Sequence, residues 1–339
     1  MADAKTIGYK PPFVYFGGKS SVAAVVWAGL GDVKNYVEPF FGSGAVLFLR
    51  PELGGLETVN DADGLLANFW RALQRDVDAV AHHADWPVSE CDLHARHLWL
   101  VGQRESITGR LCGDPDFYDA KAAGWWVWGI NCWIGSGWCS GKGPWVAGEN
   151  GIELGNSGQG VNRKLPHLGD SGRGVNRQLP HLGDSGRGEW LREYLGEFAD
   201  RLARVRVCCG DWSRVCGPSV TFKHGTTGVF LDPPYADTAG RASDLYAKDC
   251  QSVAHDVREW AIEQGKNPLL RIALAGYDGE HTMPPDWRVH EWSATGGYAL
   301  QGDDEAAGRA NSKRERLWFS PACLDHRSHS SPLFAEEQA

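Results

Sequence analysis

The chain has 339 residues, of which 42% are hydrophobic and 23% charged, and its formal net charge is −9. This length can bury a full α/β core and carry one inserted or appended domain. The acidic balance argues against a protein held on nucleic acid by its overall field, although a local basic strip can still bind DNA. The N-terminus has no apolar signal region and no run approaches 18 apolar residues, so we expect neither secretion nor membrane insertion.

The nine cysteines include no Cys-x-x-Cys pair. Neither the adjacent Cys208 and Cys209 nor the spacing of Cys132 and Cys139 is that of a metal knuckle. An odd number of cysteines fits reduced thiols better than a disulfide framework. We therefore expect a cytoplasmic protein with no bound metal.

Residues 12–80 are predicted to alternate strands and helices. A strand over 36–41 precedes Gly42-Ser43-Gly44 and a helix, and a second strand over 56–59 ends at Asn60-Asp61. Apolar side chains then recur at helical spacing from 65 to 73. Before the first strand lies Gly17-Gly18-Lys19. Lys19 would lie near a cofactor carboxylate or a target base, with Tyr15 beside it; a loop with a solvated lysine is the alternative.

The glycine turn after the first strand suits a nucleoside cofactor. Glycines let a ligand approach the backbone, and the N-terminus of the following helix favours negative charge. The turn lacks the third glycine of the dinucleotide fingerprint and the Gly-Lys-Ser/Thr of a P-loop. We predict that Asp61, on the next strand, holds the ribose hydroxyls. A tight turn with a helix cap is the alternative interpretation.

The middle of the chain, residues 85–204, has a different character. Six tryptophans fall between Trp125 and Trp145; we interpret them as the core of a small domain, with stacking beside an extruded base as the alternative. A 14-residue unit occurs twice, at 157–170 and 171–184. Its glycines and prolines suit successive loops or hairpins, and two copies are too few for a solenoid.

The repeat region is basic on an acidic protein. From 155 to 188, five basic residues stand against two acidic ones, a local charge of +3, with His167 and His181 besides. Such a strip is what phosphate contact requires, and each repeat holds an Asn-Arg pair suited to adenine and guanine edges. A duplicated, inessential loop is the alternative. The candidate DNA-binding residues are Asn162, Arg163, Lys164, Arg173, Asn176, Arg177 and Arg187.

The α/β pattern returns towards the C-terminus, where the strand over 205–207 leads into Gly210-Asp211-Trp212. The polar tail, 325–339, is predicted to be disordered. One discontinuous α/β domain, residues 1–84 and 205–324, is therefore predicted around the insertion. Helices are predicted over 192–202 and 258–264, and the other strands over 227–231, 270–275 and 317–319.

Asp232-Pro233-Pro234-Tyr235 follows the buried strand over 227–231. The prolines end the strand and fix the turn, so an acid and an aromatic lie at the carboxyl edge of the sheet, where open α/β sheets bind ligands. The Asp232 carboxylate and the Pro233 carbonyl form a pair of acceptors for an exocyclic amine, and Tyr235 can stack on the ring that carries it. This arrangement suits methylation of an amino group on a planar base; a merely rigid turn is the alternative.

In this order, Phe16-Gly17-Gly18-Lys19, Glu38–Gly44, Asn60-Asp61 and Asp232–Tyr235 resemble the Dam-type DNA adenine-N6 methyltransferases (D12 class, alpha group), and most closely their phage and orphan members. The resemblance covers about 12–80 and 205–320. It implies a Rossmann-like α/β methyltransferase fold, a mostly parallel sheet flanked by helices, with 85–204 as an inserted target-recognition domain. The middle of the chain does not match the recognition domain of the enterobacterial Dam enzymes, so the target sequence does not follow.

The resemblance implies S-adenosylmethionine as methyl donor, S-adenosylhomocysteine as product, and no metal. It also assigns residues to the site. Asn311, Arg314 and Glu315 resemble the family's closing segment, or form an exposed charged strand entry. The implied cofactor-binding residues are Tyr15, Lys19, Phe41, Gly42, Ser43, Gly44, Asp61, Asp211, Trp212 and Asp232, and the catalytic ones are Asp232, Pro233, Pro234 and Tyr235.

The implied partner is double-stranded DNA with a specific adenine-containing site. Two other functions stay open: methyl transfer to cytosine N4 or to an amine in RNA, and a DNA-binding regulator that keeps the fold without the chemistry. A palindromic target would suit either a monomer acting twice or a symmetric homodimer. Epigenetic marking, phage self-protection and one half of a restriction-modification pair are all open as biological roles.

Overall fold

The computed structural model describes most of the chain, including the residues that form the sheet, its helices and one pocket. Tyr235, the repeat at 157–184 and residues 326–339 of the tail lie outside these parts, as do Arg187, Asn311 and Arg314. The described residues are 11–13, 15, 19–51, 54–133, 138–139, 145–148, 151–154, 188–234, 252–292 and 315–325.

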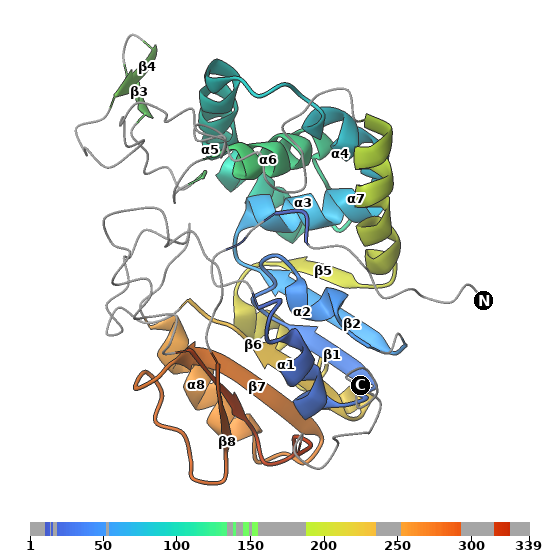
Figure 1. The fold of residues 1–339 in the computed structure, drawn as a ribbon, viewed down its shortest axis with the longest axis vertical. Helices are drawn as coiled ribbons and strands as arrows, with labels where there is room; N and C mark the ends of the chain where they lie inside the picture. Colours follow the sequence, from blue (N-terminus) through green and yellow to red (C-terminus); the bar gives the residue numbers. More distant parts are fainter. Residues whose placement is uncertain are drawn as a thin grey trace, which may run out of the picture.

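A seven-stranded sheet organises the α/β part (Figure 1). Its order is β5-β2-β1-β6-β7-β9-β8. The first five of these strands are mutually parallel, and β9 is antiparallel to both β7 and β8. The strands are β1 (Asn35–Glu38), β2 (Leu56–Asp61), β5 (Arg206–Cys209), β6 (Thr227–Leu231), β7 (Leu270–Tyr277), β8 (Arg288–Glu291) and β9 (Glu315–Phe319), with a separate antiparallel pair, β3 (Trp145–Gly148) and β4 (Gly151–Leu154).

The central strands are buried on both faces, as expected for parallel strands covered by helices. Successive residues alternate between two cores. Val229 and Leu231 of β6 belong to the core beneath α8 (Val253–Gln264), whereas Phe230 between them belongs to the core beneath α1 (Ala23–Leu30). This two-sided burial explains why β6 has an uninterrupted apolar sequence.

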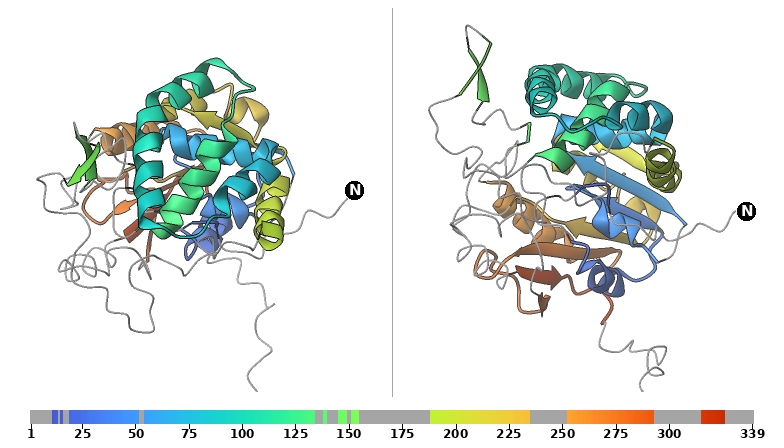
Figure 2. Two further views of the ribbon diagram at one scale, coloured as in Figure 1. Left: turned by 90° about the horizontal axis from the view of Figure 1, so that it is seen from above. Right: turned by 45° about the horizontal axis from the view of Figure 1, so that its top comes forward.

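The remaining helices form a layer beyond the β5 edge, seen from above in Figure 2. Side-chain caps mark where several of them begin: Asp63 accepts from Leu65 N, and Ser89 accepts from Asp92 N. Such caps satisfy the free N–H groups of the first helical turn. The layer comprises α3 (Gly64–Arg75), α4 (Val77–Ala84), α5 (Glu90–Gly113), α6 (Ala120–Cys132) and α7 (Gly188–Leu202), while the short α2 (Ala45–Phe48) lies against the sheet.

Part of the tryptophan-rich segment is buried in the main hydrophobic core, whereas the prediction was the core of a small domain. Trp126 and Trp128 of α6 and Trp133 just after it are all buried. They belong to one hydrophobic cluster with Phe69 and Trp70 of α3. Helix α6 therefore shares a continuous core with α3, which precedes the predicted insertion.

Several predicted boundaries differ from the structure. The first strand ends at Glu38, because Pro39 has no N–H to continue the ladder. The helix after the glycine turn is only four residues long. The strand predicted over 205–207 lies at 206–209, and the helix predicted from 258 begins at Val253. Glu315 is 4% exposed, so the interpretation of this residue as an exposed strand entry was wrong. The sequence prediction missed α1, α4, α5, α6, β3, β4 and β8.

None of the helices that the structure describes is long and apolar enough to cross a membrane. The eight cysteines in the described parts of the chain are all free thiols, and Cys132, Cys139 and Cys209 are buried.

Candidate active site

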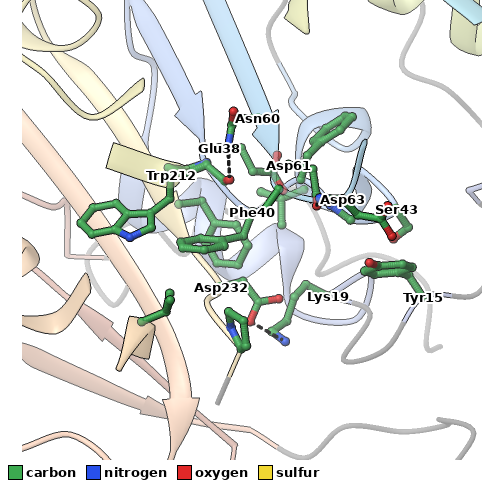
Figure 3. A pocket seen from close by; sticks show the side chains of 18 of the residues that line it. Tyr15, Lys19, Glu38, Phe40, Ser43, Asn60, Asp61, Asp63, Trp212 and Asp232 are labelled. Carbon is green, nitrogen blue, oxygen red and sulfur yellow. Dashed lines mark hydrogen bonds and ion pairs between the residues drawn. The ribbon is translucent and has the colours of Figure 1, made fainter. Parts of the chain in front are cut away.

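The carboxyl ends of the parallel strands surround one pocket of about 300 Å³ (Figure 3). This volume lies at the small end of the range for small-molecule sites. Its walls come from segments far apart in the sequence: the ends of β1, β2, β5 and β6, together with Tyr15 and Lys19 from the segment before α1. The parallel arrangement produces this convergence, since all these strands end at the same edge of the sheet.

The glycine turn forms one wall and requires glycine for two reasons. Gly42 and Gly44 have φ values of 50° and 71°, in the left-handed region that side chains disfavour. A Cβ at Gly42 would lie 2.9 Å from the Tyr15 ring. Trp70 Nε1 donates to the Gly42 carbonyl over 2.9 Å, which fixes the turn from the helical layer.

Asp61, at the end of β2, holds this turn in place. Its carboxylate accepts from Gly42 N at 3.0 Å and from Asp63 N at 2.9 Å. Burial raises the Asp61 pKa to about 7, and the backbone donors oppose that rise only in part. Each oxygen keeps a second lone pair for a hydroxyl donor, so the predicted ribose contact is compatible with these bonds.

Asp61 should make the unliganded protein less stable as the pH rises. The folded-state pKa of about 7 lies above the ordinary value of 3.8, so the folded state binds the proton more tightly. The resulting stabilisation is complete below pH 3.8 and is lost as the pH rises to about 7, at no more than roughly 1.4 kcal/mol per pH unit. Urea unfolding of the wild type and Asp61→Asn from pH 5 to 8 measures this slope. Equal slopes in the two proteins would contradict the prediction.

Asp232 and Lys19 face each other on the side of the pocket opposite Asn60 (Figure 3). Lys19 Nζ lies 3.0 Å from Asp232 Oδ1, and their side chains are 4% and 20% exposed. The ammonium group also lies 5.8 Å from the centre of the Trp292 ring, within range of a cation–π contact. The ion pair joins the lysine motif to the Asp-Pro-Pro turn, although more than 200 residues separate them in sequence.

Phe40 and Trp212 provide flat aromatic surfaces at another part of the pocket. Their ring centres are 6.4 Å apart and their planes differ by 28°. Trp212 begins a short 3-10 helix, Trp212–Val215, which Asp211 caps by accepting from Ser213 N at 3.0 Å. The cap turns the chain after β5 so that Trp212 faces the pocket.

Glu38 and Asn60 are pocket residues that the predicted site did not include. Glu38 is 2% exposed, accepts from Tyr36 Oη at 2.9 Å, and has a pKa raised well above its usual range by burial. Asn60 Nδ2 donates to the carbonyls of Pro39 and Gly210, whereas its buried Oδ1 has no hydrogen-bond partner among the described residues. Both residues belong to the motifs that resemble the D12 class: Glu38 precedes Pro39, and Asn60 precedes Asp61. Phe40, Asp63 and Thr108 were missed as well.

The structure brings most of the predicted residues together. Gly44 and Pro233 adjoin the pocket in sequence but do not line it, and Phe41 lines it while also packing on Trp70. Tyr235 lies outside the described residues. The predicted residues that line the pocket are Tyr15, Lys19, Phe41, Gly42, Ser43, Asp61, Asp211, Trp212, Asp232 and Pro234. Within the described parts of the chain, no group of three or more His, Cys, Asp or Glu side chains could hold a metal ion.

A mostly parallel open sheet with an acidic, aromatic pocket at its carboxyl edge is an architecture in which enzymes bind nucleoside cofactors. Residues 15–88 match the family model described as D12 class N6 adenine-specific DNA methyltransferase. This part of the chain is thus similar to the D12 class, and the match implies S-adenosylmethionine-dependent methylation of adenine N6 in DNA.

The matched segment contains Tyr15, Lys19, the glycine turn and Asp61, and it ends before Asp232. A search of the curated proteins returned no match. The predicted family, the α/β methyltransferase fold and the reaction are confirmed by the family match and the sheet. The resemblance to phage and orphan members, the domain boundaries and the individual residue roles stay predictions.

Proposed function

We propose that the protein methylates one adenine of a specific site in double-stranded DNA, after rotating that base out of the helix. The observation that carries this proposal is the position of Asp232. Its carboxylate lines the same pocket as the glycine turn and Asp61, 3.0 Å from Lys19. Because N6 is inaccessible to in-line attack within a duplex, the base must leave the stack, at a cost of a few kcal/mol.

The pocket fits S-adenosylmethionine, whose sulfonium carries the methyl group that is transferred. Phe40 and Trp212 would hold the cofactor's adenine ring, and Asp61 would accept from its ribose hydroxyls. The unpartnered Asn60 Oδ1 and the buried Glu38 offer acceptors for N–H groups of the cofactor. The absence of a Cβ at Gly42 lets the cofactor approach the backbone.

Asp232 and Pro233 would accept the two N6 hydrogens of the target base while Tyr235 stacks on its ring, a contact worth roughly 1–3 kcal/mol. The two acceptors aim the nitrogen lone pair at the methyl carbon. As the N6–carbon bond forms and the carbon–sulfur bond breaks, positive charge develops on N6, and N6 then releases one proton to solvent. Asp232 stabilises that charge, so its contribution is largest in the transition state. These steps require neither a metal nor a covalent enzyme intermediate.

The DNA contacts are proposed to come from the insertion, 85–204, and in particular from its basic repeat. Replacing Arg163, Arg173 and Arg177 with alanine should weaken DNA binding and remove about three units from the slope of log K against log salt, if each contacts one phosphate. Fluorescence anisotropy with a labelled duplex at several salt concentrations measures this slope. An unchanged slope would show that the repeat is an inessential loop. Arg75→Ala is the matched control, because it removes an exposed arginine that pairs with Asp116 and is not one of the candidate DNA-binding residues.

Nucleoside mass spectrometry tests the proposed function directly. The purified protein is incubated with S-adenosylmethionine and, separately, with duplex DNA, single-stranded DNA and RNA, and each product is digested. N6-methyladenine from duplex DNA is the expected result. Methylated cytosine or methylated RNA would support the alternative substrates, and DNA binding without methylation would support a regulator that has lost its chemistry. Light scattering with and without DNA distinguishes a monomer acting twice from a symmetric homodimer.

A further inference from the structure

Arg104, on α5, joins two parts of the molecule that are distant in sequence. Its Nη1 lies 2.7 Å from Asp63 Oδ1, and its Nη2 donates to the Cys139 carbonyl. The side chains of Arg104 and Asp63 are 16% and 14% exposed, so water screens the pair only partly. The guanidinium group therefore spans from the pocket wall to the chain segment that follows α6.

The Asp63 end of this bridge belongs to the cofactor pocket. Asp63 lines the pocket, and its N–H donates to the Asp61 carboxylate over 2.9 Å. Its own Oδ1 also accepts from Leu65 N at 3.0 Å, which caps α3. Thr108, one turn beyond Arg104 on α5, lines the pocket as well and donates to the Arg104 carbonyl over 2.7 Å. Arg104 thus continues a wall of the pocket.

The Cys139 end is a strained anchor. Cys139 has a φ of 55° and is the only non-glycine residue with a positive φ in the described parts of the chain. Its side chain is fully buried, and its N–H donates to His97 Nδ1 over 3.2 Å. Beside it, Trp138 Nε1 donates to the Trp126 carbonyl. Left-handed backbone at such a residue persists only where neighbours impose it, and Arg104 supplies one of the bonds that do so.

We propose that Arg104 is a positioning residue that couples the cofactor pocket to the Trp138–Cys139 anchor. This inference rests on the proposed function. A cofactor held at Asp61 stabilises the turn that carries Asp63. Asp63 then fixes the guanidinium group, and Arg104 in turn holds the Cys139 carbonyl. Cofactor binding and the ordering of the anchor should therefore favour each other by the same factor.

Alkylation of Cys139 provides a local readout that does not depend on turnover. The full-length protein is treated with iodoacetamide with and without S-adenosylhomocysteine, and peptide mass spectrometry follows the labelling rate of each cysteine. The product should slow labelling of wild-type Cys139 about fivefold or more, the lower end of common coupling factors. Cys132, buried on α6, serves as the internal control for global unfolding.

Arg104→Lys keeps the positive charge but cannot reach both partners with two separate N–H groups. In this variant the protection of Cys139 should fall below about twofold, while Cys132 stays protected. Arg75→Lys, in an exposed pair with Asp116, should behave like the wild type. If Cys132 also becomes reactive in Arg104→Lys, the Asp63→Asn variant provides the test instead. Asparagine keeps the α3 cap but removes the ion pair with Arg104. Loss of Cys139 protection in Asp63→Asn then supports the coupling.

Undiminished protection of Cys139 in Arg104→Lys or Asp63→Asn would overturn the inference. So would a wild-type protein that binds S-adenosylhomocysteine by calorimetry without protecting Cys139. These outcomes leave the proposed methyltransferase function intact. Absence of any S-adenosylhomocysteine binding to the wild type would instead overturn the proposed function, and the coupling with it.

Discussion

Asp232→Asn should lower the rate of methyl transfer at least about 10²–10³-fold, the range seen when one preorganised group at a developing charge is lost. The amide oxygen can still accept one N6 hydrogen, but it no longer carries the negative charge that the transition state requires. Single-turnover methylation with labelled S-adenosylmethionine, at saturating cofactor and DNA, measures the effect. S-adenosylhomocysteine binding should change far less, since the glycine turn and Asp61 are untouched.

Asparagine is preferred to alanine at this position because its amide oxygen keeps an acceptor for Lys19, which is almost fully buried beside Asp232. Truncating one member of a buried ion pair can cost about 3–5 kcal/mol in stability, which would confound the kinetic result. Asp78→Asn is the matched control, as it removes a carboxylate from an exposed pair with Arg192 on the helical layer. Near-wild-type turnover in Asp232→Asn would exclude Asp232 as the group that stabilises N6.

Gly42→Ala should impair cofactor binding and stability together. Alanine in left-handed backbone costs about 1–2 kcal/mol, and the new methyl group would lie 2.9 Å from the Tyr15 ring. Since Tyr15 lines the pocket and Gly42 N donates to Asp61, relief of the clash must displace groups that surround the cofactor. We expect a roughly tenfold or greater rise in the S-adenosylhomocysteine Kd, measured by calorimetry.

Gly102→Ala is the control for this substitution. Gly102 lies on the exposed side of α5, and a Cβ there would meet nothing within 4 Å. The helical backbone favours alanine over glycine by up to about 1 kcal/mol, so this variant should be as stable as the wild type or more so, with unchanged cofactor affinity. Unchanged cofactor affinity in Gly42→Ala would mean that the turn does not approach the cofactor.

The sequence determined the local features of the site because each depends on a short stretch of chain. Pro39 and Pro233 have no N–H with which to continue a strand ladder. The uninterrupted apolar run before Asp232 predicts a strand that is covered on both faces. The glycine turn likewise depends on residues that are neighbours in the sequence. Strand β6 and the place of Asp61 could therefore be predicted, as could the order of the motifs that resemble the D12 family.

Two helices of the predicted insertion, α5 and α6, were missed for an equally physical reason. Most of the apolar surface of α6 is buried on α3, α4 and α5, so this helix is apolar nearly all round and shows little of the one-sided period that marks a surface helix. Its capping aspartate, Asp119, which accepts from Ala122 N, was the local signal that could have located its start. For α5, Ser89 at the cap was the corresponding signal.

Only the tertiary structure decided which residues meet. The ion pair of Lys19 with Asp232, the bond from Trp70 to the Gly42 carbonyl and the bridge of Arg104 from Asp63 to Cys139 all join distant segments. Such contacts depend on strand order and on helix packing, which residue spacing does not encode. The sequence by itself therefore determined the chemistry available to this protein, and the fold decided how that chemistry is assembled into one pocket at the edge of the sheet.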